Sequence, residues 1–352
     1  MIFNLNSTSE VIFHVKKYFF NKNILITGFI EDDISNYLTA NNITISVAKY
    51  DLWLFHKNNS TGSIYFRTKL HKNFLKKKNV VIYFWNKNKK ESIFDLMYLL
   101  SNLSINTQIF LIGKNTSGIN TSINIFNKWM TLKKIKFMRK CSLFYGKNFK
   151  KYEFHLHNFY SKYCWKNIFI YSLPGVFGYS KVDEGTKLLI DSLQNIKKKK
   201  VLDLCCGSGI VSIFILKNFN NIQLTACDNH KNAIISCRIN FCINKVYGKI
   251  ISSDLYSNIK SKFDLIITNP PYHTDLSYNL LMIRKIILKS SNYLTSTGQL
   301  MVVLNKSINI KPILHTFIQN YVITKHNNNY IVYTIQKKFF LYPERELNPQ
   351  SC

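Results

Sequence analysis

The segment VLDLCCGSG, which runs from Val201 to Gly209, decides the fold class of this chain of 352 residues. Its apolar first half predicts a buried strand, and the helical pattern that follows spans Ile210–Asn218. Gly207 and Gly209 favour a tight strand-to-helix turn whose backbone a ligand can approach closely. Dinucleotide-binding turns carry a third glycine where this chain has Ser212, and the Lys-Ser/Thr pair of a phosphate-binding loop is missing. The turn therefore favours a ligand other than a pyrophosphate.

The sequence downstream of this turn alternates between strand and helix patterns. Apolar runs predict strands, and apolar residues at helical spacing predict the helices between them. Strands are expected at Gln223–Cys227, Gly248–Ser252, Asp264–Thr268, Gly298–Asn305 and from Tyr330 onward, with helices at Lys231–Ile243 and Ser277–Tyr293. This alternation predicts an α/β fold with a parallel, doubly wound sheet whose ligand lies at the carboxyl ends of the strands.

A fainter version of the same order runs through the first half of the chain. Strands are expected at Asn23–Phe29, Ile45–Phe55, Asn79–Trp85 and Thr107–Gly113, with a helix between the last two. The basic and aromatic stretch Lys147–Ile170 has little pattern and is predicted to be a linker. We therefore expect two α/β domains of related design, at residues 1–160 and 161–340, and a tail at 341–352 with no assigned place.

The charge of the chain is strongly positive. Lys and Arg total 48 against 18 Asp and Glu, which gives a formal net charge of +30. Such a charge favours a polyanionic partner, because each neutralised phosphate releases counterions. An AT-rich genome produces the same composition, so charge alone favours nucleic acid only slightly. The basic runs Lys72–Lys78, Lys87–Lys90, Lys133–Lys140 and Lys197–Lys200 are candidate phosphate contacts, although each is individually more often a solvated face.

Composition also excludes several classes of protein. Hydrophobic residues make up 46% of the chain, which is typical of a globular protein and not of a disordered one. The eight cysteines form no C-x-x-C pair, so no zinc site is predicted and free buried thiols are expected. Neither a secretory signal nor a membrane span is visible. We therefore expect a cytoplasmic protein that binds no metal and no membrane.

Three carboxylates follow successive predicted strands. Asp203 ends the strand before the glycine turn, Asp228 ends the next one, and Asp254 follows the third. A carboxylate at the position of Asp228 accepts hydrogen bonds from both ribose hydroxyls of a nucleoside, and Asp254 is placed to accept from an adenine amine. Singly, each is more often a solvated acid in a loop. Together, after a glycine turn, they predict an adenosyl cofactor without a pyrophosphate, which is S-adenosylmethionine.

The most specific motif is NPPY, from Asn269 to Tyr272, directly after the predicted strand DLIIT. Pro270 and Pro271 fix the backbone and remove two donors. The side-chain oxygen of Asn269 and the carbonyl of Pro270 can then accept hydrogen bonds from one planar amine, and Tyr272 offers a ring for stacking. Because the lone pair of such an amine is delocalised, catalysis of methyl transfer is mostly alignment and needs neither a metal nor a strong base. A Pro-Pro turn with an Asx cap is the bland alternative.

The two motifs together resemble the class I methyltransferases that act on amino or amide nitrogen. LPGVF and DEGTKLLIDSL, within Leu173–Leu193, narrow the resemblance to the ribosomal small-subunit methyltransferase C family, which methylates guanine N2 in 16S rRNA. SEVIFHV, ILITGFIEDDI, VVIYFWNKNKKESIFDLMYLLS and GKNTSGI are similar to the first domain of that family. The likeness extends from about Ser9 to about Lys337 and so covers nearly the whole chain.

The resemblance implies two tandem Rossmann-like methyltransferase domains. The second would be catalytic, and the first would be a degenerate copy that supports folding and binds rRNA, with Tyr83–Asn86 in the place of NPPY. Phe177 would lie beside the methionine end of the cofactor. Cys205 stands where many relatives carry glycine and is placed in the cofactor site. The implied partner is 16S rRNA in the small ribosomal subunit, and the implied state is a monomer.

Two other classes of function remain open from the residues alone. NPPY also occurs in methyltransferases that act on adenine N6 or on a glutamine amide of a release factor. A protein that only binds rRNA during assembly, with a decayed methyl site, is the third hypothesis. The presence of Asp203, Gly207, Gly209 and the whole NPPY motif argues against such decay.

Overall fold

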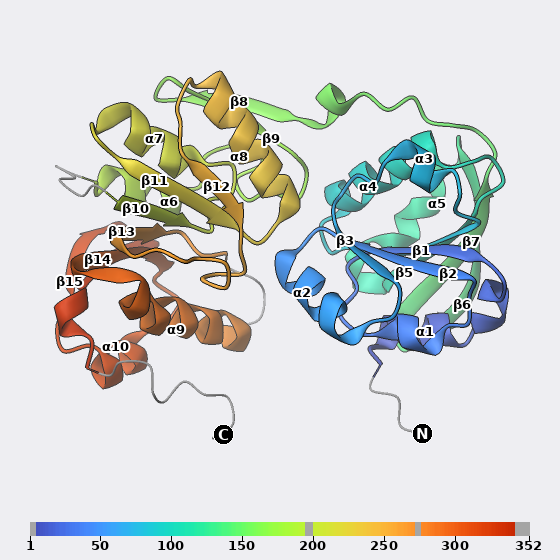
Figure 1. Ribbon diagram of the computed structural model, residues 1–352, viewed down its shortest axis with the longest axis horizontal. Helices are drawn as coiled ribbons and strands as arrows, with labels where there is room; N and C mark the ends of the chain where they lie inside the picture. Colours follow the sequence, from blue (N-terminus) through green and yellow to red (C-terminus); the bar gives the residue numbers. More distant parts are fainter. Residues whose placement is uncertain (1–4, 194–199, 272–275, 342–352) are drawn as a thin grey trace. The chain divides into compact units, whose positions relative to one another are not determined.

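A computed structural model describes residues 5–193, 200–271 and 276–341 of the chain (Figure 1). By its contacts the chain divides into two compact units, Met1–Tyr160 and Ser161–Cys352. Each unit contains a seven-stranded sheet among its described residues, and the second also contains a two-stranded hairpin. The expectation of two α/β domains with Rossmann-like sheets is confirmed.

The sheet of the second unit has the strand order β12-β11-β10-β13-β14-β16-β15. Its strands are β10 (Lys200–Leu204), β11 (Gln223–Asp228), β12 (Lys249–Ser252), β13 (Phe263–Thr268), β14 (Leu294–Asn305), β15 (Val322–His326) and β16 (Tyr330–Gln336). The first five strands of that order run parallel, and β16 is antiparallel to both of its neighbours. Parallel strands place their carboxyl ends at one edge, where the glycine turn and NPPY follow β10 and β13.

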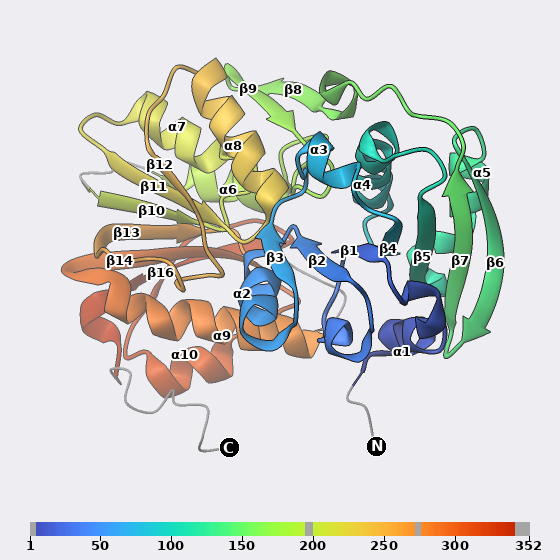
Figure 2. The same cartoon turned by 45° about the vertical axis from the view of Figure 1, so that its right-hand side comes forward.

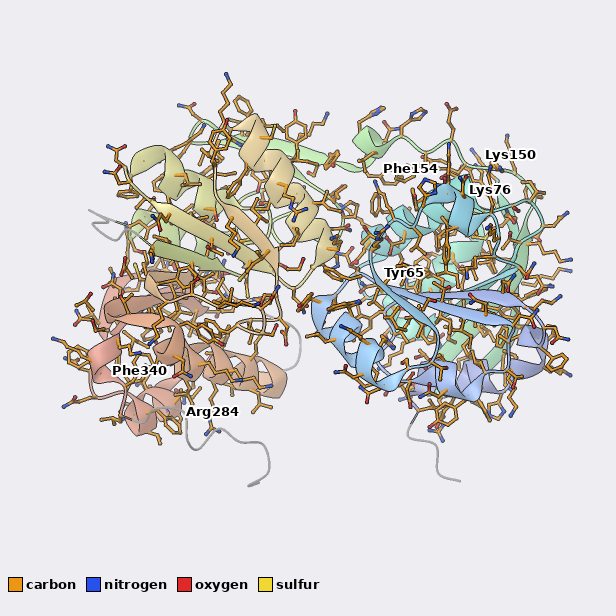
Figure 3. The ribbon with its side chains drawn as sticks, in the orientation of Figure 1. Tyr65, Lys76, Lys150, Phe154, Arg284 and Phe340 are labelled. Atoms are coloured by element: carbon orange, nitrogen blue, oxygen red, sulfur yellow. The ribbon has the colours of Figure 1, made fainter. Side chains whose placement is uncertain are left out.

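Helices cover both faces of this sheet, and the core therefore has two layers (Figure 1). On one face lie α6 (Glu184–Asp191), α7 (Ile210–Asn218) and α8 (Lys231–Ile243), and on the other lie α9 (Leu276–Tyr293) and α10 (Lys311–Phe317). The two outer helices α9 and α10 also contact each other, because the guanidinium of Arg284, labelled in Figure 3, lies 5.1 Å from the centre of the Phe317 ring. The central strands β10, β13 and β14 are mostly buried, as the sequence predicts for a parallel sheet, but the sheet is mixed because β16 runs antiparallel to both of its neighbours.

The first unit repeats this order as β3-β2-β1-β4-β5-β7-β6. Its strands are β1 (Asn23–Gly28), β2 (Asn42–Val47), β3 (Ser63–Phe66), β4 (Val80–Phe84), β5 (Gln108–Lys114), β6 (Met130–Met138) and β7 (Cys141–Asn148). Its helices are α1 (Ser7–Phe13), α2 (Tyr50–Asn59), α3 (Lys72–Leu75), α4 (Lys89–Asn102) and α5 (Ser122–Phe126). Figure 2 shows the twisted sheet of this unit with its helices on both faces.

One expectation about an element in the first half is wrong. The single strand predicted over Ile45–Phe55 is the end of β2 followed by α2, whose aromatic residues Tyr50 and Trp53 pack together at helical spacing, 5.3 Å apart. A short apolar run does not distinguish a strand from a helix, and this one contains both.

The predicted linker Lys147–Ile170 contains the boundary between the two units, after Tyr160, but it has more secondary structure than its weak pattern indicated. It contains the hairpin of β8 (Ser161–Trp165) and β9 (Ile168–Ser172). Phe154, labelled in Figure 3, stacks on Phe159 at 5.0 Å, and both rings pack against α4. The stretch between the strands is therefore fixed to the first unit by aromatic contacts. The tail at 342–352 lies outside the described residues, as do Lys197–Lys199.

Candidate active site

A pocket opens at the carboxyl edge of β10 and β13. Its lining residues come from β8, from the stretch before α6 with the first turn of that helix, from the end of β10 through the glycine turn to the start of α7, and from the residue after β13. Of the predicted site residues it contains Phe177, Asp203, Cys205, Gly207 and Asn269. Gly209, Asp228, Asp254, Pro270 and Pro271 are described but do not line it, and Tyr272 lies outside the described residues.

The glycine turn has the left-handed backbone that its sequence predicts. Gly207 has φ +54° and Gly209 has φ +83°. A Cβ on Gly209 would lie 2.6 Å from Sγ of Cys237, so this glycine is required for packing against α8. A Cβ on Gly207 would meet nothing closer than the carbonyl of Phe177 at 3.7 Å, so the space beside it is open to a ligand. Cys205 has φ +62°, a conformation that glycine adopts without strain.

The carboxylates of Asp203 and Asp228 hold the glycine turn in place through hydrogen bonds. Asp203 is 2% exposed, and its Oδ2 accepts hydrogen bonds from the backbone N–H of Ser212 at 3.1 Å and from its hydroxyl at 2.5 Å. Burial, with a smaller contribution from the nearby Asp228, raises the pKa of Asp203 from 3.8 to about 7. Asp228 accepts from the N–H of Gly207 at 2.9 Å and of His230 at 2.8 Å. Burial raises the pKa of Asp228 as well.

Asp254 follows β12, as the sequence predicts. The side chain is half-buried, and its backbone N–H donates to Oγ of Ser257 at 3.1 Å. It thus stands at the third strand end of the same edge, one strand beyond Asp228.

Asn269 has the most informative environment in the site. Its Nδ2 donates to Oδ2 of Asp183 at 3.0 Å and to Oγ1 of Thr186 at 2.8 Å. Its Oδ1 is buried and has no hydrogen-bond partner among the described residues. Pro270, which follows, is also buried. Because a buried acceptor without a partner costs free energy, its presence at a pocket indicates that a ligand supplies the donor.

Several lining residues were not predicted from the sequence, and three of them carry polar side chains that bond within the site. Asp183 and Thr186 form a D-x-x-T signature in which Asp183 caps the amino terminus of α6, and this signature was visible without an assigned role. Tyr163 comes from the β8–β9 hairpin, and its hydroxyl donates to the carbonyl of Gly178 at 3.1 Å. No signal in the predicted linker pointed to Tyr163.

Two features of this pocket fit an adenosyl cofactor. The open space beside Gly207 leaves room for a ligand against the backbone, and the carboxylates of Asp228 and Asp203 bond to the backbone of the same turn and of the helix that follows it. Within the described ranges, no three His, Cys, Asp or Glu side chains are grouped so as to hold a metal ion. No helix in the same ranges has the length and apolar character that a membrane crossing requires.

Comparison with known families identifies both halves of the chain. The Methyltransferase small domain model matches residues 167–334, and the Methyltransferase small domain N-terminal model matches residues 9–163. A solved structure of similar fold is the T. thermophilus 16S rRNA N2 G1207 methyltransferase in complex with AdoMet and guanosine. It has a TM-score of 0.75 at 14% identity and covers 94% of this chain and 91% of that one.

Curated relatives are similar over almost their full length. The ribosomal RNA small subunit methyltransferase C of Buchnera aphidicola from Acyrthosiphon pisum is 38% identical over 331 residues, which is 94% of this chain and 98% of the relative. The protein of the same name from Proteus mirabilis is 30% identical over 335 residues, covering 95% and 99%. The chain therefore belongs to the ribosomal RNA small subunit methyltransferase C family.

Proposed function

We propose that this chain transfers the methyl group of S-adenosylmethionine to the exocyclic N2 of a guanine in 16S rRNA. Family membership supports an rRNA methyltransferase. The T. thermophilus enzyme of similar fold carries AdoMet and guanosine, the same pair of ligands that the proposal requires here. The observation that carries the proposal is the buried, unpartnered Oδ1 of Asn269 at the edge of the pocket.

The residues after β13 align the amine. A guanine amine is a poor nucleophile because its lone pair is delocalised into the ring. Oδ1 of Asn269 and the carbonyl of Pro270 accept its two hydrogens, which favours the geometry needed for attack on a methyl group. Pro270 and Pro271 keep this corner rigid. Tyr272 stays a sequence prediction as the stacking residue, with the target base taken out of its helix.

The glycine turn and the acids hold the cofactor. S-adenosylmethionine, when bound, supplies a methyl group on a positively charged sulfur. Asp228 binds the ribose hydroxyls and Asp254 the adenine amine, while Gly207 lets the ligand approach the backbone. Gly209 keeps the turn packed against α8, and Asp203 supports the turn through Ser212. Phe177 and Cys205 complete the wall of the pocket.

Asn269→Ala tests the role of the amide. We expect methyl transfer to small subunits to fall roughly 10²–10³-fold, as for loss of one oriented polar group in an active site. Affinity for S-adenosylmethionine, measured by calorimetry, should stay within about twofold, since the cofactor is held by other residues. A variant with wild-type rates would overturn the alignment mechanism.

The substrate is tested by mapping the methyl group. Small subunits, bulk DNA and release factors are incubated with labelled S-adenosylmethionine, and the product is located by mass spectrometry. We expect label on guanine N2 of 16S rRNA. Label on adenine N6 or only on a glutamine amide would refute the proposed substrate, and the absence of both label and binding heat would favour a non-catalytic assembly factor.

We propose further that the substrate is the assembled small subunit, that the enzyme acts as a cytoplasmic monomer, and that the first unit contacts the rRNA. The strand β6 supports the last point, because it lies at the sheet edge and exposes Lys133, Lys134 and Phe137. Lys78, in another basic run, is buried and donates to Asn42 and Thr44, so it is unsuited to a phosphate contact. Sedimentation of the free protein at its monomer mass of 41.3 kDa would support the monomer.

A further inference from the structure

An asparagine side chain serves as an acceptor only if its amide is turned the right way. The oxygen and the NH₂ group have nearly the same shape, and a half-turn about the last bond exchanges them. Neighbouring donors and acceptors therefore decide which atom faces a ligand. For Asn269 this choice matters, because the proposed reaction needs Oδ1 at the amine, whereas the NH₂ group would repel it.

The neighbours of Asn269 leave only one orientation. Asp183 presents a carboxylate oxygen at 3.0 Å, and an ionised carboxylate only accepts hydrogen bonds. Thr186 adds a hydroxyl oxygen at 2.8 Å. If the amide turned over, its oxygen would face the oxygen of Asp183 with no proton between them. Asp183 and Thr186 thus bind the nitrogen and leave Oδ1 for another donor.

The two partners are themselves held in place. The same Oδ2 of Asp183 accepts the backbone N–H of Thr186 at 3.1 Å and so caps α6. Thr186 is 6% exposed. Gly185 between them leaves room for this arrangement, because a Cβ there would lie 3.0 Å from Oδ2 of Asp183 and 3.0 Å from the ring of Tyr330. The chain brings this turn of α6 to Asn269 across 83 and 86 residues of sequence.

We propose that Asp183 and Thr186 are positioning residues of the methyl transfer, which fix the Asn269 amide with its oxygen free for the guanine amine. The inference rests on the proposed role of Asn269 and adds two residues that act through it. It predicts that their effect on catalysis depends on Asn269 being present, and that it is separate from the capping of α6.

Asp183→Asn is the decisive variant. Asparagine caps a helix as well as aspartate does, so the fold of α6 is preserved. The new side chain can donate as well as accept, so it no longer selects one orientation of Asn269. We expect kcat for methylation of small subunits to fall about 10- to 100-fold, with the Kd for S-adenosylmethionine and the melting temperature unchanged. E184Q, which removes an exposed carboxylate from the same helix turn, is the matched control and should keep the wild-type kcat.

Thr186 gives an independent comparison. Thr186→Val keeps the shape and removes the hydroxyl, whereas Thr186→Ser keeps the hydroxyl. We expect the serine variant to retain several times more activity than the valine variant. Equal activities of the two would contradict a role for the Thr186 hydroxyl.

Double variants separate positioning from an independent effect. In the Asn269→Ala background, Asp183→Asn should cause no further loss, because there is no amide left to orient. Asn269→Asp alone places two carboxylates opposite each other. Adding Asp183→Asn restores a hydrogen-bond donor between the two side chains, so the double variant should be faster than Asn269→Asp. Losses that multiply, or a double variant no faster than Asn269→Asp, would overturn the inference.

The outcomes distinguish this inference from the proposed function. Wild-type kcat in Asn269→Ala would sink the proposed role of Asn269 itself. A low kcat in Asn269→Ala together with a wild-type kcat in Asp183→Asn would sink only the positioning role.

Discussion

The Asp203 carboxyl is deeply buried, and among the described residues it accepts its hydrogen bonds from Ser212 alone. Its pKa of about 7 in the folded protein is well above its ordinary value of 3.8. Between these values the folded state binds more protons than the unfolded state, so this group makes the free energy of unfolding fall as the pH rises through 7. A cation bound near Asp203 would favour the ionised carboxylate and so lower its pKa.

We predict that affinity for S-adenosylmethionine rises with pH. The cofactor is positively charged at sulfur and favours ionised Asp203, so the Kd should decrease from pH 6 to pH 8 by up to about tenfold per unit below the pKa. Calorimetry at pH 6, 7 and 8 measures this, with Asp203→Asn as the comparison. A wild-type Kd that does not change with pH, or an equal slope in Asp203→Asn, would contradict the prediction.

The residue types at the strand ends predicted part of the candidate site. The other residues could not be predicted from the sequence, and the reason is physical. Asp203, Gly207 and Asn269 lie at strand ends, where α/β sheets place their ligands, and they meet in one pocket. Asp183 and Thr186 belong to the start of a helix, and their approach to Asn269 depends on how α6 packs. Spacing along the chain carries no information about such a contact.

At the scale of elements, α8 carries a buried polar stripe. Asn232, Ser236, Asn240 and Asn244 recur every fourth residue and are 0 to 7% exposed. In turn they bond to the backbone of Pro174, Leu173, Tyr171 and Phe169. The stripe thus supplies the edge of β9 and the segment that leads to Phe177 with hydrogen bonds that another strand would otherwise provide.

Asn240→Ala should destabilise this part of the molecule. Asn240 bonds both backbone groups of Tyr171 and the carbonyl of Ser208 in the glycine turn, at 2.8 to 3.0 Å. Removing it leaves these groups unpaired, which costs about 2–4 kcal/mol of unfolding free energy and weakens cofactor binding.

Denaturant unfolding of the variant measures this cost. Cys242→Ala, on the exposed side of the same helix, should change the unfolding free energy by less than about 0.5 kcal/mol. If the two variants are equally stable, the stripe contributes nothing to stability.

The strands and helices of the second unit were predictable because the apolar patterns that indicate them are long and do not run into one another. Each predicted strand and helix from Val201 to Gln336 lies where the structure has one, although α10 and β15 were not anticipated. β15 is exposed along its whole length, so it lacks the apolar run by which a strand is recognised. The β8–β9 hairpin was missed although Ile168 and Ile170 lie in the apolar core, because each of its strands has only five residues and their apolar pattern is correspondingly short.

At the scale of the whole molecule, two units share one strand order but differ at the edge that holds the site. In the first unit a Cβ on Gly28 would lie 2.1 Å from the carbonyl of Phe84, whereas the space beside Gly207 is open. Asn86, which follows β4, uses its side chain to bond Glu91 and Asn88, whereas Oδ1 of Asn269 has no partner. A pocket also lies at this edge of the first unit, and Gly28 and Asn86 line it, but there both ends of the asparagine amide are bonded within the chain.

We predict that the basic edge strand of the first unit binds rRNA. Changing Lys133, Lys134 and Lys136 to Glu should weaken binding to small subunits and reduce its dependence on salt, because fewer counterions are released. The control variant changes Lys217, Lys245 and Lys249 to Glu, which alters the net charge by the same amount. These residues lie near the amino-terminal ends of the strands of the second sheet, away from the pocket at their carboxyl ends. Binding measured across salt concentrations should differ between the two triple variants, and identical salt slopes would contradict this role of β6.

The central claim concerns one atom, Oδ1 of Asn269, and a structure with S-adenosylhomocysteine and guanosine bound tests it most directly. We predict that guanine N2 lies about 3 Å from Oδ1, with Nδ2 still bonded to Asp183. A guanine amine beyond hydrogen-bond reach of Asn269, or one that faces Nδ2, would contradict the account.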